Sequence, residues 1–319
     1  MKPCEQRRGR FFNPHLKKDC RSLWDFFLWR VGYYKDATPL ELAPAGFLYP
    51  SALRPVDLSK PNAVWIGHST YLVDSKEWTI LTDPVLGHYC SPVPVRGLRR
   101  RVPPALNLKE LPPIDAVFIS HNHYDHLEHR TVKALHRKYP NILWIIPKGL
   151  KKWFSKRGIE RTVELQWGES HIVDGQKITA VPAQHFSGRS LLDKDRTLWN
   201  GYVLETAGKT LYFAGDTGYN PFDFKEIGKR FPQIDLSLIP IGSYAPRRFM
   251  SPVHCSPADG VQIHMDVKSN LSLGMHWNTF RLSSEPFDQP PYDLYLAMKE
   301  NNLPFDTFLP QEMGIYVNW

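Results

Sequence analysis

Residues 114–126 read Ile-Asp-Ala-Val-Phe-Ile-Ser-His-Asn-His-Tyr-Asp-His, an apolar run that ends in four side chains of metal-binding type. The β-branched run predicts a buried strand, so the histidines begin where a strand passes into a loop. Because alternate side chains of extended backbone share a face, His121 and His123 can bind one ion while Asp125 and His126, beyond the bend, reach a second. A single buried histidine is usually structural, but four such side chains within six residues favour a metal site.

Three further candidate ligands each follow an apolar run later in the chain, and they are His185, Asp216 and His276. Strand ends that each deliver a histidine or an aspartate predict one edge of a sheet sandwich lined with ligands. The ordered set H-x-H-x-D-H, His, Asp, His resembles the metallo-β-lactamase superfamily. That resemblance implies an α/β (α+β) fold, a four-layer αββα sandwich.

Longer phrases narrow the resemblance. Residues 65–70 (Trp-Ile-Gly-His-Ser-Thr), 213–219 (Phe-Ala-Gly-Asp-Thr-Gly-Tyr), 239–244 (Ile-Pro-Ile-Gly-Ser-Tyr) and 276–280 (His-Trp-Asn-Thr-Phe) are similar to the N-acyl-phosphatidylethanolamine-hydrolysing phospholipase D branch. The resemblance implies an enzyme that cleaves N-acyl-phosphatidylethanolamine to phosphatidic acid and an N-acylethanolamine. The loop around Val253 departs from the animal lipid hydrolases, which leaves the head-group preference open.

The ligand set predicts two zinc ions per chain. Nitrogen and oxygen donors without a thiolate fit zinc, although iron and manganese accept the same donors. We assign one ion to His121, His123 and His185, the other to Asp125, His126 and His276, and a bridging position to Asp216. Such paired ions lie about 3.5 to 4 Å apart and trap a bridging hydroxide, so Asp125 and Asp216 are the predicted catalytic carboxylates.

Three other residues could act either near the metal ions or only in the structure of the chain. Asp83, which precedes Pro84, is a candidate to orient a ligand histidine, with a turn residue as the alternative. His68 either approaches the site or holds a turn, and we favour the turn. His264, within a helical pattern over residues 257–267 that Ser256 caps, is assigned a structural role.

Two residues are candidates for substrate contacts. Arg189 follows a predicted ligand, and its planar guanidinium can hold two phosphate oxygens. The alternative for Arg189 is an ion pair with Asp193 or Asp195. His254, in a proline-flanked loop, is expected to line the mouth of the substrate site.

The chain divides into an N-terminal extension, residues 1–60, and a catalytic domain, residues 61–319. Residues 22–34 are rich in aromatic side chains, and helical spacing places Trp24 and Phe27 on one face. Such a helix either packs across the sandwich or lies on a bilayer and lines an acyl-chain groove, where Trp24 and Phe27 contact substrate.

The formal charge of +8 and the isoelectric point near 9.2 suggest anionic partners, whether phospholipid, nucleic acid or a phosphorylated small molecule. Arginines concentrate in an extended loop after Pro92, which is either a solvated surface or a landing surface for anionic head groups. Since no nucleic-acid-binding motif is visible, we expect no nucleic-acid partner. Aromatic surfaces predict a homodimer.

The four cysteines show no paired spacing, which indicates a reducing compartment. No apolar stretch reaches the ~18 to 20 residues of a membrane span. We therefore expect a cytoplasmic protein with peripheral contact to the inner face of a membrane.

The predicted metal chemistry leaves three hypotheses open. The first is the zinc-dependent phospholipase D, and the second is a hydrolase of the same fold that acts on a soluble lactone or another phosphodiester. The third is a non-catalytic lipid- or RNA-binding module. A complete ligand set argues against the third, because a binding protein need not keep all seven ligands.

Overall fold

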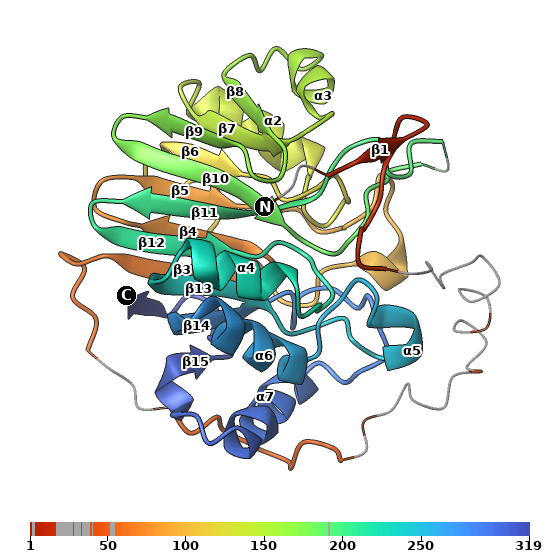
Figure 1. Ribbon diagram of the computed structural model, residues 1–319, viewed down its shortest axis with the longest axis vertical. Coiled ribbons are helices and arrows are strands. Elements are labelled where there is room, and N and C mark those ends of the chain that lie inside the picture. Colours follow the sequence, from red (N-terminus) through yellow and green to blue (C-terminus); the bar gives the residue numbers. More distant parts are fainter. Residues whose placement is uncertain are drawn as a thin grey trace.

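The computed structural model describes residues 1, 4–16, 28, 33, 39, 41–51, 55–190 and 192–319. Within these residues two seven-stranded sheets pack face to face, and helices cover both outer faces (Figure 1). This arrangement confirms the predicted four-layer αββα sandwich. Its middle layers are the two sheets, so the largest apolar core lies between them.

The first sheet has the order β16-β3-β4-β5-β6-β7-β8. Its strands are β3 (Asn62–Gly67), β4 (Thr70–Asp74), β5 (Thr79–Thr82), β6 (Ala116–Phe118), β7 (Leu143–Pro147), β8 (Thr162–Leu165) and β16 (Tyr316–Asn318). From β5 to β8 the pairs are parallel, so the strands end at one edge. Val132 and Leu135 of α2 (His129–Lys138) and Phe154 of α3 (Lys151–Ser155) pack on its outer face.

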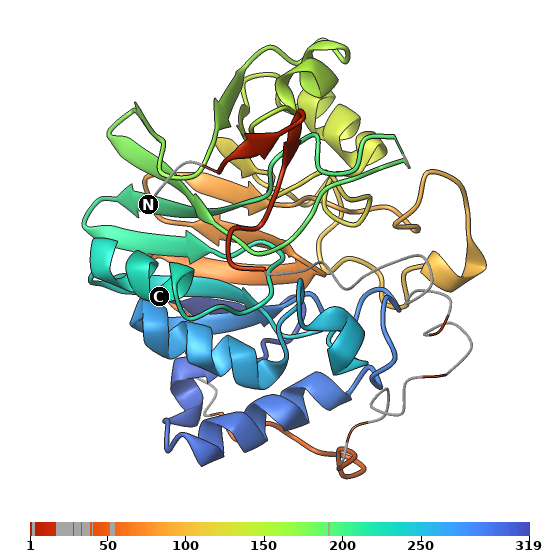
Figure 2. The ribbon, with the colours of Figure 1, turned by 45° about the vertical axis from the view of Figure 1, so that its right-hand side comes forward.

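The second sheet has the order β15-β14-β13-β12-β11-β10-β9. Its strands are β9 (Ser170–Val173), β10 (Gln176–Pro182), β11 (Asn200–Thr206), β12 (Lys209–Phe213), β13 (Ile234–Pro240), β14 (Ser269–Met275) and β15 (Phe308–Leu309). Figure 2 shows three helices along its outer face: α4 (Asp223–Arg230), α6 (Pro257–Val267) and α7 (Gln289–Glu300). The short α5 (Arg247–Met250) and η3 (Phe305–Thr307) lie in connections.

Two tyrosines tie the sheets together across the core. The Tyr71 hydroxyl of β4 donates to the Gly274 carbonyl of β14 at 2.7 Å. The Tyr202 hydroxyl of β11 donates to the Ile119 carbonyl, just beyond β6, at 2.9 Å. Each buried hydroxyl therefore has a partner on the opposite sheet, which holds the ends of the strands in a fixed relation.

The sequence predicted most of these elements. The strand expected before His121 is confirmed as β6, and the apolar runs before His185, Asp216 and His276 are confirmed as β10, β12 and β14. The helix over 257–267 is confirmed as α6, with the Ser256 side chain accepting from the Asp259 amide in a capping box. Helices α4 and α7 were not predicted. In α7 the prolines at the first turn hid the signal, although Pro is well tolerated there because those amides have no helical partner.

Parts of the N-terminal extension pack on the sandwich. A small hairpin of β1 (Gln6–Arg7) and β2 (Arg10–Phe11) buries Phe11 against Trp199. Farther on, the Tyr49 hydroxyl donates to the Phe308 carbonyl at 2.8 Å. Trp24 and Phe27 lie outside the described residues, so their predicted contacts and the domain boundary at residue 60 stay predictions. Among the described residues no helix has the length and apolar character to cross a bilayer.

Candidate metal centre

The predicted ligands meet at one edge of the sandwich, in the loops that follow β6, β10, β12 and β14. His121 to His126 follow β6, His185 follows β10, Asp216 follows β12 and His276 follows β14. The three strands β12, β13 and β14 are parallel, as are β5 to β8, so their carboxyl ends lie together at this edge. Residues more than 150 positions apart in the chain become neighbours there.

The first ligand group consists of the three histidines assigned to one ion. The Nε2 atom of His121 lies 2.7 Å from Nδ1 of His123. The Nε2 atom of His185 lies 3.2 Å from the same His123 nitrogen. Three imidazole nitrogens thus converge on one point, with His121 and His185 buried.

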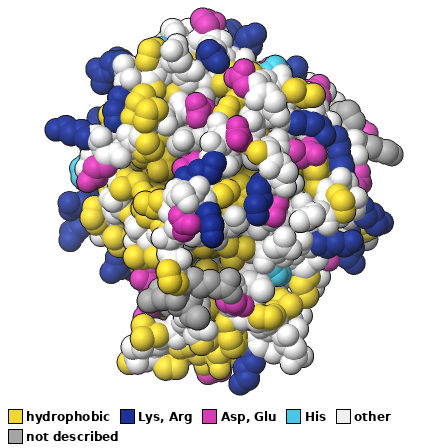
Figure 3. Space-filling view, turned by 90° about the vertical axis from the view of Figure 1, so that its left-hand side faces the viewer, with side chains coloured by type: hydrophobic (Ala, Val, Ile, Leu, Met, Phe, Trp, Pro, Cys, Tyr) yellow, Lys and Arg dark blue, Asp and Glu magenta, His cyan; other side chains and the backbone are white. Residues whose placement is uncertain are grey.

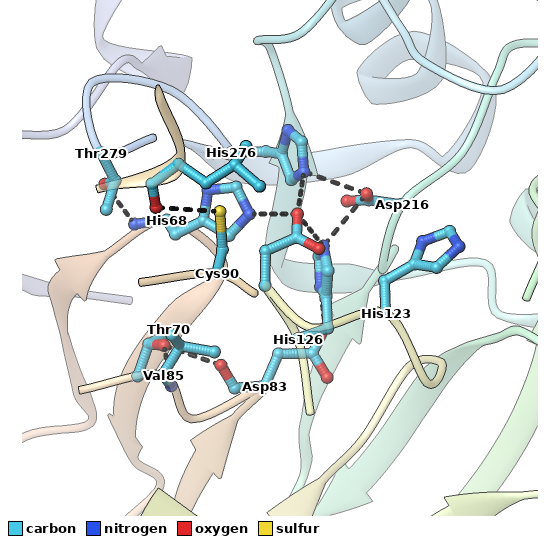
Figure 4. Close-up of polar contacts among 12 residues, drawn as sticks. His68, Thr70, Asp83, Val85, Cys90, His123, His126, Asp216, His276 and Thr279 are labelled. Atoms are coloured by element: carbon cyan, nitrogen blue, oxygen red, sulfur yellow. Dashed lines mark hydrogen bonds and ion pairs between the residues drawn. The ribbon is translucent and has the colours of Figure 1, made fainter. Parts of the chain in front are cut away.

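The second group gathers around the carboxylate of Asp125 (Figure 4). Its Oδ2 lies 3.4 Å from Nε2 of His126 and 3.6 Å from Nε2 of His276, as assigned to the second ion. Nε2 of His68 lies closer still, at 2.9 Å from the same oxygen. The prediction that His68 merely holds a turn was wrong. Its backbone does occupy a left-handed turn, with φ of 53°, but that turn aims the imidazole into the centre.

Asp216 lies between the two groups, where a bridging ligand belongs. Its Oδ2 is 3.1 Å from Nε2 of His126 and 3.0 Å from Nε2 of His276. On the other side it is 3.8 Å from Nε2 of His185. Within the described part of the chain, Nε2 of His126, Nε2 of His276 and Oδ1 of Asp216 are buried without a hydrogen-bond partner. Unsatisfied nitrogen and oxygen donors that converge in this way fit a pair of metal ions.

The charges also suit metal ligation. Burial acts to raise the pKa values of Asp125 and Asp216, but the imidazoles beside them, that of His126 foremost, hold both well below the usual range. Burial lowers the pKa values of His121 and His185 well below the usual histidine value. Ionised carboxylates and neutral imidazoles are the forms that bind metal, so little deprotonation opposes binding at these four residues.

Asp83 makes the orienting contact that the sequence suggested for it. Its carboxylate accepts from Nδ1 of His126 at 2.6 Å and from the Ser120 amide at 2.7 Å. A proton held on Nδ1 leaves Nε2 of His126 to face Asp216. The Ser120 hydroxyl also contacts Asp83 and lies 2.8 Å from Nδ1 of His121, so one carboxylate supports a histidine of each group. We did not predict the role of Ser120, although it directly precedes the motif.

Arg189 contacts the loop that carries the predicted ligands, and the phosphate contact predicted for it stays a prediction. Its Nη1 donates to the Asn122 carbonyl at 2.9 Å and to the Leu127 carbonyl at 2.7 Å, the two ends of the ligand loop. Its guanidinium stacks 3.8 Å over the ring of Tyr124. In return, the Asn122 side chain accepts from the amide of Gly188 at 2.7 Å. Arg189 therefore fastens the loop that carries four ligands.

Within the described structure, the Asp193 carboxylate meets the backbone of Arg189 and not its guanidinium. Its Oδ1 accepts from the Arg189 backbone amide at 2.9 Å, which shapes the turn. His254 does lie at the edge of the centre, partly exposed, with Nδ1 3.9 Å from Oδ2 of Asp216. Its ring centroid is 5.1 Å from that of His185. His254 thus lies beside the candidate centre, and its contact with substrate stays a prediction.

Comparison with known proteins identifies the family. Residues 78–277, more than half of the chain, match the β-lactamase superfamily domain. An N-acyl-phosphatidylethanolamine-hydrolysing phospholipase D 1 of Caenorhabditis elegans is 37% identical over 263 residues, which cover 79% of this chain and 74% of the relative. The chain belongs to this phospholipase D family.

A second member of the phospholipase D family has a similar degree of identity. The mitochondrial N-acyl-phosphatidylethanolamine-hydrolysing phospholipase D of Saccharomyces cerevisiae is 35% identical over 286 residues, covering 87% of this chain and 61% of the relative. Among solved structures, an isothiocyanate hydrolase from Delia radicum gut bacteria superposes with a TM-score of 0.64 at 19% identity, covering 81% and 98% of the two chains. Fold and family together make this chain a hydrolase of the metallo-β-lactamase fold.

Proposed function

We propose that this chain is a zinc-dependent phospholipase D that hydrolyses N-acyl-phosphatidylethanolamine to an N-acylethanolamine and phosphatidic acid. One observation carries the proposal: a complete two-group ligand set, joined at Asp216, in a chain that belongs to the phospholipase D family. We expect two zinc ions, one held by the His121 group and one by the Asp125 group.

Bound zinc supplies positive charge that polarises phosphoryl oxygens and lowers the pKa of water. The protein supplies the geometry around it. Asp83 holds the His126 ring in place, and Arg189 holds both ends of the ligand loop. Burial of His121, His126, His185 and His276 keeps bulk water away from the ligands, which strengthens electrostatic interactions with a substrate phosphate.

The overall reaction adds water across the bond between phosphorus and the oxygen of the N-acylethanolamine. The hydroxyl group goes to phosphorus, and the proton goes to the departing oxygen. His254, at the edge of the centre and close to Asp216, is our candidate for contact with the substrate phosphate. Trp24 and Phe27 remain candidates for contact with the acyl chains. Homodimer formation and the absence of a nucleic-acid partner remain predictions.

The test is hydrolysis of N-acyl-phosphatidylethanolamine in mixed micelles, with the products resolved by mass. Zinc-loaded wild type should release both products, while Asp125→Asn and a chelated sample should release neither. A zinc-loaded enzyme that leaves this lipid intact but opens a soluble lactone or cleaves a generic phosphodiester would refute the lipid substrate. The metal assignment would survive that result.

A further inference from the structure

The loop that follows Asp83 is unusual in its charge. Residues 84–109 contain no aspartate or glutamate. The cations in this stretch are Arg96, Arg99, Arg100, Arg101 and Lys109. At the opposite end of the sandwich, where the β9–β10 and β11–β12 turns lie, basic and acidic side chains are interspersed (Figure 3). The loop therefore presents positive charge that no neighbour in sequence neutralises.

The tip of this loop, residues 92–97 (Pro-Val-Pro-Val-Arg-Gly), is exposed at every position. Val93 is 61% exposed and Val95 is 42% exposed, which is unusual for two apolar side chains so close together. The prolines at 92 and 94 restrict the backbone, and a 3₁₀ turn, η2 (Arg96–Leu98), follows. Figure 2 shows the loop and η2 projecting at the edge of the molecule.

The base of the loop is held firmly. The Cys90 amide donates to the Leu98 carbonyl at 3.2 Å, and the Arg100 amide donates to the His88 carbonyl at 2.8 Å. The buried guanidinium of Arg100 donates to the carbonyls of Gly87, at 3.0 Å, and Val85. Because the two sides of the loop's base are joined in this way, the apolar tip is presented as a projection that is held at its base.

The stem also connects directly to the metal centre. The Arg101 amide donates to the Thr279 carbonyl at 2.9 Å, while the Thr279 hydroxyl accepts from the His68 amide at 2.7 Å. The ring of Phe280 packs edge-on against the His68 ring at 5.2 Å. A partner surface that binds the tip would therefore lie at a fixed position relative to the metal ligands.

Two of the cations beside the tip are available to a partner. In the part of the chain that the structure describes, neither Arg96 nor Arg99 is bonded to a carboxylate. Both are exposed. Exposed apolar side chains flanked by arginines match the interface of an anionic bilayer, where apolar groups enter the acyl boundary and cations meet phosphate. RNA would use the arginines but would leave Val93 and Val95 in water, and the tip offers no aromatic ring for base stacking.

We infer that the tip, residues 92–97, with Arg99, docks this enzyme on anionic membranes. Val93 and Val95 insert at the acyl boundary, and Arg96 and Arg99 bind lipid phosphate. The inference rests on the proposed function, because docking would present the metal centre to a lipid substrate.

The first measurement is co-sedimentation of the zinc-loaded full chain with vesicles of phosphatidylcholine, with and without phosphatidylserine, and free of N-acyl lipid. Val93→Ser/Val95→Ser should weaken binding about tenfold on both kinds of vesicle. Arg96→Gln/Arg99→Gln should weaken binding about tenfold on the anionic vesicles alone. The matched controls lie elsewhere on the surface and should bind as wild type: Ile172→Ser in β9 and Lys225→Gln/Lys229→Gln in α4.

The second measurement separates docking from catalysis. All variants should hydrolyse a short-chain, monomeric N-acyl-phosphatidylethanolamine at the wild-type rate, while the two tip variants should be slow on the same lipid in vesicles. If wild type fails to bind the anionic vesicles, or if the tip variants bind as wild type does, the inference is overturned. If Arg96→Gln/Arg99→Gln loses binding to a labelled single-stranded RNA but still binds vesicles, the inference is overturned in favour of an RNA partner. Failure of wild type on the monomeric lipid would instead count against the proposed function.

Discussion

Histidines are buried in two regions of this molecule, and their surroundings differ. In α6, His264 stands alone, with Nδ1 2.8 Å from the Ser272 hydroxyl and its ring stacked on Phe308. At the metal edge, the ring nitrogens of His126 and His276 meet carboxylates, and their Nε2 atoms form no hydrogen bond within the described structure. His264 is satisfied by one hydroxyl partner, whereas the cluster keeps buried nitrogen atoms in the arrangement of metal ligands. Burial alone therefore does not identify a functional histidine.

The same contrast appears in protonation. Burial lowers the pKa of His264 to about 4. Burial opposes protonation of His276 as well, but the carboxylates of Asp216 and Asp125 beside the ring raise its pKa to about 9. Two buried imidazoles thus shift in opposite directions because only one of them has carboxylates beside it.

Metal removal should give the largest difference between the two regions, measured as a loss in the free energy of unfolding. A ligand present at about a thousand times its dissociation constant stabilises the folded state by about 4 kcal/mol, so chelation should remove about that much from the free energy of unfolding. Thermal unfolding with and without chelator measures the loss. His264→Asn should lose as much as wild type on chelation, while Asp216→Asn should lose far less. Identical melting of wild type in both samples would contradict the metal centre.

Acid should affect His264 through a different mechanism. Its folded pKa of about 4 lies below the unfolded value of about 6.5, so the unfolded chain binds more protons between these values. Stability from the neutral ring is complete above about pH 6.5 and is lost as pH falls towards 4, about 3 kcal/mol in total. Denaturant unfolding of wild type and His264→Gln at a series of pH values measures this contribution as their difference. A difference that does not change with pH would show that His264 is not held neutral.

Loss of the Asp83 carboxylate, which orients His126, should have a smaller effect than removal of the ions. Asp83→Asn weakens the contacts to His126 and Ser120, and loss of such a partner typically lowers metal affinity 10- to 100-fold. Competition with a chelating dye measures the zinc affinity. Asp74→Asn is the matched control, because Asp74 pairs with Lys76 at the partly exposed end of β4. Equal zinc affinity in both variants would make Asp83 a turn residue only.

The smallest expected effect is that of Arg189→Lys. A lysine cannot reproduce the stack on Tyr124 together with two carbonyl contacts, and the loss of about one net hydrogen bond corresponds to about fivefold weaker zinc binding. Arg230→Lys is the control, because Arg230 lies over the ring of Phe231 at the end of α4, on the outer face of the second sheet. A raised KM with unchanged zinc affinity would instead restore the phosphate contact that the sequence suggested.

Much of the metal centre could be predicted because its ligands follow buried strands. His121 and Asp216 both end apolar runs, and parallel pairing brings such ends to one edge without further information. His68 carried no such signal. It follows Gly67 in a tight β3–β4 turn, and a positive φ decides where its side chain points. Arg189 was placed correctly beside the centre, but its partners are backbone carbonyls, which a pattern of side chains does not reveal.

The amino-acid sequence by itself determined the family, the sandwich and the seven candidate ligands, because strand periodicity and ligand spacing are local properties of the chain. Only the tertiary structure decided which groups those ligands meet. It placed His68 against Asp125, set Asp83 behind His126, and turned the Arg189 guanidinium towards the ligand loop. These choices depend on turns and on side-chain directions across distant segments. Distances of a few ångströms between such segments follow from the packing of the two sheets, which no local pattern records.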